Sequence, residues 1–383
     1  MAFKKKEAPS LGLIGIDIGA AGIKAVELVP VEQRLKLETY GYANAPKELA
    51  GLLDRPKEAA AILMHLVKKA GMKSVRCNAA LPSQDVFHAI ITIPQPRTAK
   101  EDLKPMIESQ VKKLTPMPIE DMILDSTVID KHLLPKAGAP EKPVEKPAKD
   151  KKEEGQKKED NPLIGEKKDR QHIRVLVSGA PKVLIQKYVE IFKLAKLDLV
   201  SLETEAFAQI RSLIGRDKTR MMVVDIGKSR TNLTIVSEGI PFLHRSIKSG
   251  GDAMTEILAK QMGVESAQAE QAKRDLAFGG ASELPAALKD ALQPIIHEVR
   301  YSLEQYGQQF AGETGIDKII LTGGSVQLPH IGEFFTEQLD RSVYIGDPWA
   351  RLATPKGLQP VLDEVGARFS VAVGLAMKQG KKV

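Results

Sequence analysis

The sequence predicts an α/β protein built from two similar halves, and two related phrases are the main reason. Residues 15–24 read GIDIGAAGIK, and residues 221–235 read MMVVDIGKSRTNLTI. Each phrase is an apolar run, then Asp-Ile-Gly, then a turn, then a second apolar run, as in two strands joined by a tight turn. One such hairpin near the start and one in mid-chain indicate two half-molecules that face each other.

The composition allows sizeable hydrophobic cores and does not select one class of partner. The chain has 383 residues, which predicts about two or three domains. Hydrophobic residues make up 43%, but aromatic residues only 4%, which argues against stacking platforms for single-stranded nucleic acid. The net charge of +7 is modest for this length and decides little between nucleic acid, a membrane surface and an acidic protein.

The sequence features that indicate a cellular compartment favour the cytosol. Cys77 is the only cysteine, so the chain cannot form an internal disulfide. The seven histidines lack metal-ligand spacing. Lys4 to Lys6 and the apolar residues 11–16 resemble the start of a signal peptide, but Asp17 interrupts that run. No uninterrupted apolar stretch is long enough to cross a bilayer, and we therefore expect a cytosolic protein.

The first half is expected to form a sheet with one covering helix. Residues 11–29 form the first hairpin, and residues 35–42 alternate between apolar and polar side chains and extend the sheet. Residues 57–70 place apolar side chains at helical spacing. Residues 75–81 read as a further strand, which Pro82 ends.

A small inserted subdomain is expected at residues 85–198. Its elements are expected in the order strand, helix, strand, strand, helix, at 86–93, 100–114, 123–129, 173–178 and 183–195. That order suits a two-layer α/β subdomain. Residues 136–170 consist mainly of Lys, Glu, Asp, Pro and Gly, and they cannot bury enough surface to become ordered. We therefore expect a disordered charged loop there.

The rest of the chain returns to the first half and then builds the second. Residues 199–213 run from a strand into a helix, with Glu205 at the junction. After the second hairpin, Gly250-Gly251-Asp252 begin a helix, where backbone N–H groups can meet an anion. Further elements are expected as helices at 265–278 and 284–306, a strand opening into a Gly-Gly turn at 319–325, and a helix of small residues at 370–377 that packs closely against another helix.

The residue types in the two hairpins suit a phosphate and a hydrated cation. Glycine lacks a Cβ, so its backbone N–H group can approach a phosphate closely. A lone carboxylate at each strand end, Asp17 and Asp225, can hold Mg²⁺, which prefers oxygen ligands and keeps several waters. Lys24 would supply a point charge for phosphate oxygens. Either phrase alone fits an ordinary hairpin better, whereas the whole set of motifs favours a nucleotide.

Taken in order, these motifs resemble the five-part nucleotide signature of the actin, sugar-kinase and heat-shock-chaperone superfamily. The two Asp hairpins resemble its phosphate motifs, and Glu205 resembles the water-orienting position on its first connecting helix. The resemblance implies two RNase-H-like, actin-like ATPase domains hinged by two helices, with Mg-ATP between them and Mg²⁺ held by Asp17 and Asp225 through water. It implies nucleotide contacts from Gly19, Ala20, Ala21, Gly22, Lys24, Gly227, Lys228, Ser229, Thr231, Asn232, Gly250, Gly251, Asp252, Glu270, Lys273, Arg274, Gly323, Gly324 and Ser325.

Within that superfamily the chain most resembles the PilM family, the FtsA-like actins of type IV pilus assembly. Stretches within 87–125, 299–306 and 346–351 carry this narrower resemblance. It implies a cytoplasmic adaptor at the inner face of the cytoplasmic membrane, in a type IV pilus or a related type II secretion system. That adaptor would bind the cytoplasmic N-terminal segment of a PilN-like membrane protein in a nucleotide-linked manner, with other pilus proteins or self-association as further contacts.

The resemblance also implies domain boundaries. The first actin-like domain would comprise residues 10–84, 199–220 and 364–383, and the insert would comprise residues 85–198 with an FtsA-type α/β fold. The second actin-like domain would comprise residues 221–363, with a helical subdomain at about 252–310. The last residues, 377–383, lack an obvious amphipathic membrane helix, so membrane contact is expected through the partner.

The chain departs from the superfamily pattern in three places. Ala20 and Ala21 stand where many relatives carry a hydroxyl that touches phosphate, and Lys228 stands where glycine is frequent. Glu205 lacks the neighbouring proline of hydrolytic members. We therefore expect ATP binding with at most slow turnover.

Two other functions remain open at this point. A small-molecule kinase would need a general base aimed at a substrate hydroxyl, and the sequence offers no carboxylate for it beyond Asp17, Glu205 and Asp225. Phosphate transfer to a panel of sugars or acids would favour that function. An FtsA-like division protein would form filaments, which ATP-dependent sedimentation would detect.

Overall fold

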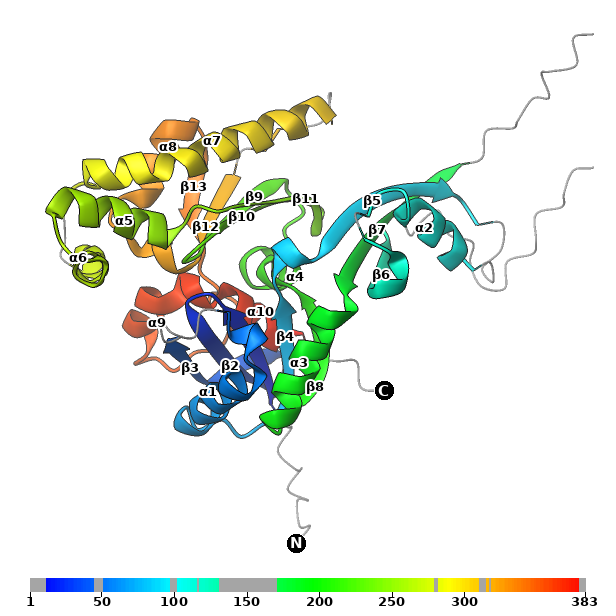
Figure 1. Ribbon diagram of the computed structural model, residues 1–383, viewed down its shortest axis with the longest axis horizontal. Helices are drawn as coiled ribbons and strands as arrows, with labels where there is room; N and C mark the ends of the chain where they lie inside the picture. Colours follow the sequence, from blue (N-terminus) through cyan, green and yellow to red (C-terminus); the bar gives the residue numbers. More distant parts are fainter. Residues whose placement is uncertain are drawn as a thin grey trace, which may run out of the picture. The chain divides into compact units, whose positions relative to one another are not determined.

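The computed structural model describes most of the chain, and Figure 1 shows its helices and strands. The described residues are 12–44, 51–96, 102–115, 117–130, 171–278, 282–309, 315–316 and 318–378. The charged stretch 136–170, which we expected to be disordered, lies outside the described residues, as do residues 379–383.

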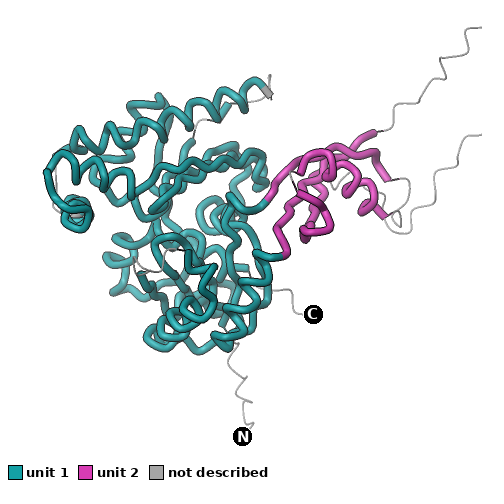
Figure 2. The backbone as a smooth tube through the Cα atoms, in the orientation of Figure 1, with its two compact units in different colours: residues 1–86, 183–383 teal, residues 87–182 magenta. Residues whose placement is uncertain are grey.

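The chain divides into two compact units (Figure 2). The first contains residues 1–86 and 183–383, and the second contains residues 87–182. The expected boundaries placed a helix at 183–195 in the insert. The structure groups this helix with the first unit, apart from Lys182, where the observed helix begins. That helix, α3 (Lys182–Leu194), buries Tyr188, Ile191 and Phe192, and its Lys187 ammonium lies 2.5 Å from the exposed Asp54 carboxylate of the first unit.

One five-stranded sheet contains the first expected hairpin. Its strand order is β3-β2-β1-β4-β8. The strands are β1 (Leu13–Gly19), β2 (Gly22–Val31), β3 (Arg34–Asn44), β4 (Arg76–Leu81) and β8 (Asp198–Thr204). Strand β2 pairs antiparallel with β3 and β1, and β4 is parallel to β1 and β8. Helix α1 (Pro56–Lys69) follows β3, with Ala59, Ala60, Leu63 and Leu66 buried on one side.

The second sheet repeats this arrangement. Its order is β11-β10-β9-β12-β13, with the same pattern of antiparallel and parallel pairs. The strands are β9 (Met221–Ile226), β10 (Thr231–Ser237), β11 (Ile240–Ile247), β12 (Lys318–Thr322) and β13 (Ser342–Ile345). Strand β9 is buried almost throughout, as expected for an apolar central strand covered on both faces. Two sheets of one topology confirm the predicted pair of RNase-H-like halves.

Helices complete the second half and lead back to the first. They are α5 (Gly251–Met262), α6 (Ser266–Phe278), α7 (Ala286–Gln309), α8 (Ile331–Leu339) and α9 (Gln359–Val365), with 3-10 turns at Leu52–Asp54, Ser83–Asp85, Gly324–Gln327 and Gly366–Phe369 in the same unit. The core of this half joins Met222 and Val224 of β9 to Leu292 and Ile295 of α7.

Two helical segments cross at the junction of the halves. Helix α4 (Glu205–Gln209) continues into a π-helix at Ile210–Ile214, and α10 (Ser370–Met377) packs against both. A Cβ added at Gly374 would lie 1.9 Å from the Ala208 carbonyl oxygen, so the two backbones are in direct contact. The expected close packing of the small-residue helix is confirmed.

The second unit is a three-stranded sheet with one helix. Its order is β5-β7-β6, all antiparallel. The elements are β5 (Phe87–Pro94), α2 (Lys104–Val111), a 3-10 turn (Ile119–Asp121), β6 (Met122–Val128) and β7 (His172–Pro181). Its core joins Ile91 and Ile93 to Ile107 and Val111 of the helix, which confirms a two-layer α/β insert. Across both units, no helix in the described part of the chain is long and apolar enough to span a bilayer.

Candidate functional site

The first carboxylate of the site lies on β1 and is paired across the hairpin. In the register of β1 and β2, Asp17 stands directly opposite Lys24. The Lys24 ammonium lies 2.7 Å from Asp17 Oδ2, and Asp17 is only 5% exposed. The two residues are therefore held together by the strand register as well as by their charges.

The second carboxylate occupies the equivalent place in the second half. Asp225 on β9 stands opposite Asn232 on β10, as Asp17 stands opposite Lys24. Its Oδ2 accepts a hydrogen bond of 2.6 Å from the Gln209 side-chain amide. Asp225 is thus paired with an amide from α4 (Glu205–Gln209), whereas Asp17 is paired with the ammonium opposite it in its own hairpin.

Glu205 connects the two halves. It begins α4, and its Oε2 accepts hydrogen bonds of 3.2 Å from the Ser83 backbone N–H and 3.2 Å from the Asn232 side-chain amide. The other side-chain atom of that amide, Asn232 Oδ1, is buried with no hydrogen-bond partner among the described residues. A buried acceptor without a partner is unusual and marks a place where a ligand or water can donate.

Electrostatics shows that these charged groups share one site. Burial, together with the nearby charges of Asp17 and Asp225, raises the pKa of Glu205 to about 8. Burial also raises the pKa of Asp225 to about 6, against the opposing effects of Lys24 and the Gln209 hydrogen bond. For Lys24, burial lowers the pKa, but attraction to Asp17, Asp225 and Glu205 outweighs it, so the pKa is raised. A divalent cation would offset the repulsion among the carboxylates.

The glycine-rich turns of the second half converge on the same place. The Gly227 carbonyl accepts hydrogen bonds from the Gly251 N–H at 2.9 Å and from the Ser325 hydroxyl at 3.1 Å. The Lys228 carbonyl accepts one of 2.8 Å from the Asp252 N–H. Three expected motifs, far apart in sequence, are therefore joined by hydrogen bonds.

Side chains would not fit at two of these glycines. A Cβ at Gly250 would lie 2.7 Å from the Gly227 carbonyl oxygen. At Gly323, where φ is 98°, it would lie 2.4 Å from Asp225 Oδ1. The turn in the first half also carries no large side chain. Gly19 pairs with Gly22, whose φ is 139°, and Ala20 and Ala21 between them are exposed. These turns offer backbone groups rather than side chains to a ligand.

Some expected contact residues already have partners within the fold. The Thr231 hydroxyl is buried and donates to the Ser249 carbonyl at 2.7 Å, whereas Lys228, Ser229 and Gly324 are exposed.

On α6, the Lys273 ammonium contacts the Gly251 carbonyl at 2.8 Å and the Glu270 carboxylate at 2.6 Å. Arg274 lies 3.0 Å from the same carboxylate. The α6 charges are thereby fixed against the start of α5.

The donor set fits a hydrated magnesium ion better than an enclosed one. In the described part of the chain, no three His, Cys, Asp or Glu side chains are arranged to surround a metal ion. Asp17 and Asp225 would therefore supply only part of the coordination, and water and phosphate oxygens would supply the rest, as is usual for Mg²⁺.

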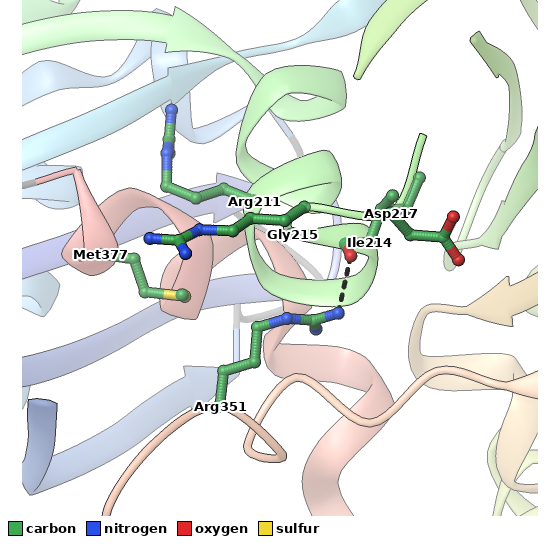
Figure 3. A pocket seen from close by; sticks show the side chains of 7 residues that line it. Arg211, Ile214, Gly215, Asp217, Arg351 and Met377 are labelled. Atoms are coloured by element: carbon green, nitrogen blue, oxygen red, sulfur yellow. Dashed lines mark hydrogen bonds between the residues drawn. The ribbon is translucent and has the colours of Figure 1, made fainter. Parts of the chain in front are cut away.

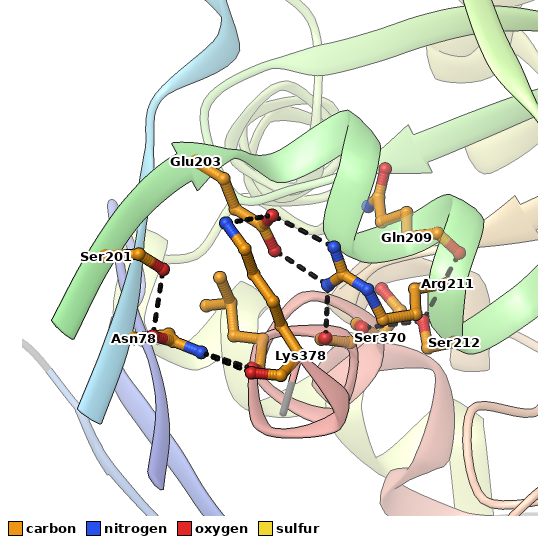
Figure 4. Close-up of polar contacts among 10 residues, drawn as sticks. Asn78, Ser201, Glu203, Gln209, Arg211, Ser212, Ser370 and Lys378 are labelled. Carbon is orange, nitrogen blue, oxygen red and sulfur yellow. Dashed lines mark hydrogen bonds and ion pairs between the residues drawn. The ribbon is translucent and has the colours of Figure 1, made fainter. Parts of the chain in front are cut away.

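A polar network fixes the junction behind the site. The Arg211 guanidinium pairs with both oxygens of Glu203, at 2.7 and 2.9 Å, and the Lys378 ammonium lies 3.0 Å from the same carboxylate. Figure 4 shows these groups, together with Asn78, which donates to the Lys378 carbonyl at 3.1 Å. Glu203 therefore joins the end of α10 to the π-helix that follows α4.

An open pocket of about 550 Å³ lies on another side of this junction (Figure 3). None of the expected nucleotide contacts lines it. Two of its arginines are used by the fold, because Arg351 donates to the Ser212 and Ile214 carbonyls at 2.7 and 2.6 Å and Arg211 pairs with Glu203. Its labelled lining residues are Arg211, Ile214, Gly215, Asp217, Arg351 and Met377.

The sequence analysis missed Gln209 and Ser83, which contact the expected carboxylates. Gln209 had a detectable signal, since it is a polar residue four positions after Glu205 in an otherwise apolar helix. Ser83 contributes only its backbone N–H, which any residue other than proline would supply.

Comparison with known proteins gives a family and a fold. The model of the family described as "Type IV pilus assembly protein PilM" matches residues 15–142 and 161–380, which is most of the chain. A solved structure, the "PilM-PilN type IV pilus biogenesis complex", aligns with a TM-score of 0.73 and 22% identity over 97% of this chain and 99% of that one.

More distant structures also align along the chain. The ethanolamine utilization protein EutJ from Carboxydothermus hydrogenoformans has a TM-score of 0.49 and 15% identity, over 97% of this chain and 91% of that one. MreB5 of Spiroplasma citri bound to ADP has a TM-score of 0.48 and 13% identity, over 96% of each chain.

Proposed function

The chain belongs to the family of the type IV pilus assembly protein PilM, and on this basis we propose that it is an ATP-binding adaptor of the pilus assembly platform. We place it at the cytoplasmic face of the inner membrane, where it would bind the cytoplasmic N-terminal segment of a PilN-like protein. ATP would bind with Mg²⁺ between the two halves.

The observation that carries the nucleotide proposal is the convergence of Asp17, Asp225 and Glu205 beside bare glycine turns. Asp17 and Asp225 would orient waters on Mg²⁺, and Lys24 would turn from Asp17 toward a phosphate or remain shared between the two. The turns at 19–22 and 227–230 would offer backbone N–H groups to phosphate oxygens. Bound ATP supplies the negative charge that the cation and Lys24 balance.

The sugar and base would lie against the second half. Gly323 and Ser325 approach Asp225 and Gly227 closely, and α6 holds Glu270, Lys273 and Arg274 at the start of α5. Because ATP would contact both halves, its binding would favour the closed state over an open one. Glu205 would orient a water, with slow turnover because Ala20 and Ala21 offer no hydroxyl to the phosphates.

Calorimetry with purified protein tests the nucleotide site. We expect Mg-ATP to bind the unmodified chain, and Asp17→Ala or Asp225→Ala to abolish that binding. Asp363→Ala is a matched control, because this carboxylate is exposed on α9 and contacts only Gln359 of the same helix among the described residues. Unchanged affinity in both site variants would defeat the assignment.

The partner is tested by pull-down from cell extract with and without ATP. The proposal rests on the family and on the likeness to the solved PilM-PilN complex. We expect a PilN-like protein to co-purify, in an amount that depends on ATP, and a synthetic peptide of its N-terminal segment to compete. Retention that the peptide does not displace, or no PilN-like protein in either condition, would contradict the proposal.

A further inference from the structure

A buried glutamine on the junction helix holds one of the two expected magnesium carboxylates. Gln209 is 3% exposed, and its side-chain nitrogen lies 2.6 Å from Asp225 Oδ2. An ionised carboxylate only accepts hydrogen bonds, so the amide must present its nitrogen here. A hydrogen bond to a charged group in a buried setting is among the stronger polar contacts in proteins.

Gln209 acts together with Glu205 one helical turn earlier. Residues four apart lie on the same face of a helix, and these two contact Asp225 and Asn232, which stand opposite each other on β9 and β10. Helix α4 therefore forms side-chain hydrogen bonds with two neighbouring strands of the second sheet, and it follows directly from β8 of the first sheet. These two contacts join the halves at the carboxylates themselves.

The second oxygen of Asp225 faces a different neighbour. Oδ1 lies so close to Gly323 that a Cβ there would be 2.4 Å away, and Gly323 opens the turn that we expect beside the nucleotide. With Oδ2 bound by Gln209, the carboxylate plane is fixed and Oδ1 is directed toward that turn. A group that orients a metal-binding carboxylate commonly changes metal affinity about 10- to 100-fold when it is removed.

We propose that Gln209 is a positioning residue that couples Mg²⁺ affinity to closure of the two halves. Its hydrogen bond can form only when the second sheet lies against α4, so the state with an oriented Asp225 is the closed state. Magnesium would then bind the closed state better, and closure would in turn raise magnesium affinity. This inference rests on the proposed Mg-ATP site and adds a regulatory link to it.

Ser212 provides a matched comparison on the same segment. Its side chain is fully buried, and its hydroxyl donates to the Ser370 carbonyl at 2.7 Å, so it loses a buried hydrogen bond on substitution, as Gln209 does. Figure 4 shows Ser212 directed toward Ser370. A general loosening of the junction would affect both variants, whereas only Gln209 contacts Asp225, since the Ser212 hydroxyl reaches the backbone carbonyls of Ser370 and Gln209.

The experiment measures ATP affinity by calorimetry in saturating Mg²⁺ and in EDTA, and the ratio of the two affinities gives the magnesium dependence. Gln209→Met keeps length and helix propensity but removes the donor. We expect its ratio to fall about tenfold or more, while its affinity in EDTA stays within about twofold. Ser212→Ala should keep the ratio of the unmodified protein. If Gln209→Met does not fold, Gln209→Asn, which retracts the amide by one carbon, replaces it with the same expectation.

Two results would overturn the inference. One is an unchanged ratio in Gln209→Met, and the other is an equal loss in Ser212→Ala, which would make the effect a loosening of the junction. Failure of the proposed function is distinguishable, because it would show already as absence of ATP binding by the unmodified protein.

Discussion

The crossing of α4 and α10 offers the sharpest test of how the two halves are joined. At Gly374, an added methyl group would lie 1.9 Å from the Ala208 carbonyl oxygen and 2.4 Å from its carbonyl carbon. Real Cβ atoms essentially never approach closer than 3.0 Å. Because the obstructing atoms belong to the backbone of α4, Gly374→Ala must push one helix away from the other.

The expected cost is the difference between two opposed effects. Alanine in place of glycine inside a helix stabilises it by about 1 kcal/mol. Forcing a methyl group into a packed interior costs about 1–3 kcal/mol, and a backbone obstacle places this case near the upper end. The net expectation for Gly374→Ala is destabilisation by about 2 kcal/mol.

Gly307→Ala is the matched control. Gly307 lies in α7, and a Cβ there would meet nothing within 4 Å among the described residues, so the propensity gain should appear alone. Trp349, the only tryptophan, is buried in the cluster that includes Ala372, Val373 and Ala376 of α10, so its fluorescence reports unfolding of this region. Urea denaturation followed by that signal gives the two free energies of unfolding.

The two variants should differ by about 3 kcal/mol, with Gly307→Ala the more stable. Equal stabilities would mean that the helices do not touch at this point and would refute the packing argument. A tightly packed but adaptable crossing would instead give a small loss of stability together with altered ATP affinity, because closure of the halves uses the same helices.

Two further outcomes concern charged groups at the same junction. For Glu205, the folded-state pKa of about 8 lies above the ordinary value of 4.5. Between these two pH values the folded chain therefore keeps a proton that the unfolded chain has lost. Stability should therefore fall as pH rises from about 5 to 8. The stability gain of Glu205→Gln over the unmodified protein should be largest above pH 8. The same difference in melting temperature between the two proteins across pH 5–9 would contradict this. Glu203→Gln removes the charge that pairs with Arg211 and Lys378, and a loss of about 3 kcal/mol is expected in urea denaturation, whereas a loss below about 1 kcal/mol would mean that solvent screens these ion pairs.

Much of the fold was readable from local patterns. Alternating side chains, glycine turns and helical spacing predicted both hairpins, the small insert and the close-packed last helix, because each depends on residues near one another in sequence. The predicted insert, 85–198, and the second compact unit, 87–182, differ mainly by α3, which follows that unit along the chain but contacts the first unit, for example through Lys187 and Asp54. No local pattern contains that contact.

For the candidate site as well, some features followed from the sequence and others only from the tertiary structure. The sequence by itself determined which groups were available: a carboxylate at each strand end, bare turns that only glycine permits, and a lysine or an amide one strand away. The tertiary structure decided which of them meet, because Glu205 and Gln209 reach Asn232 and Asp225 only when α4 lies against the second sheet. It also decided their charge, since burial and mutual repulsion, which raise the pKa values of Glu205 and Asp225, arise only after distant segments have packed together.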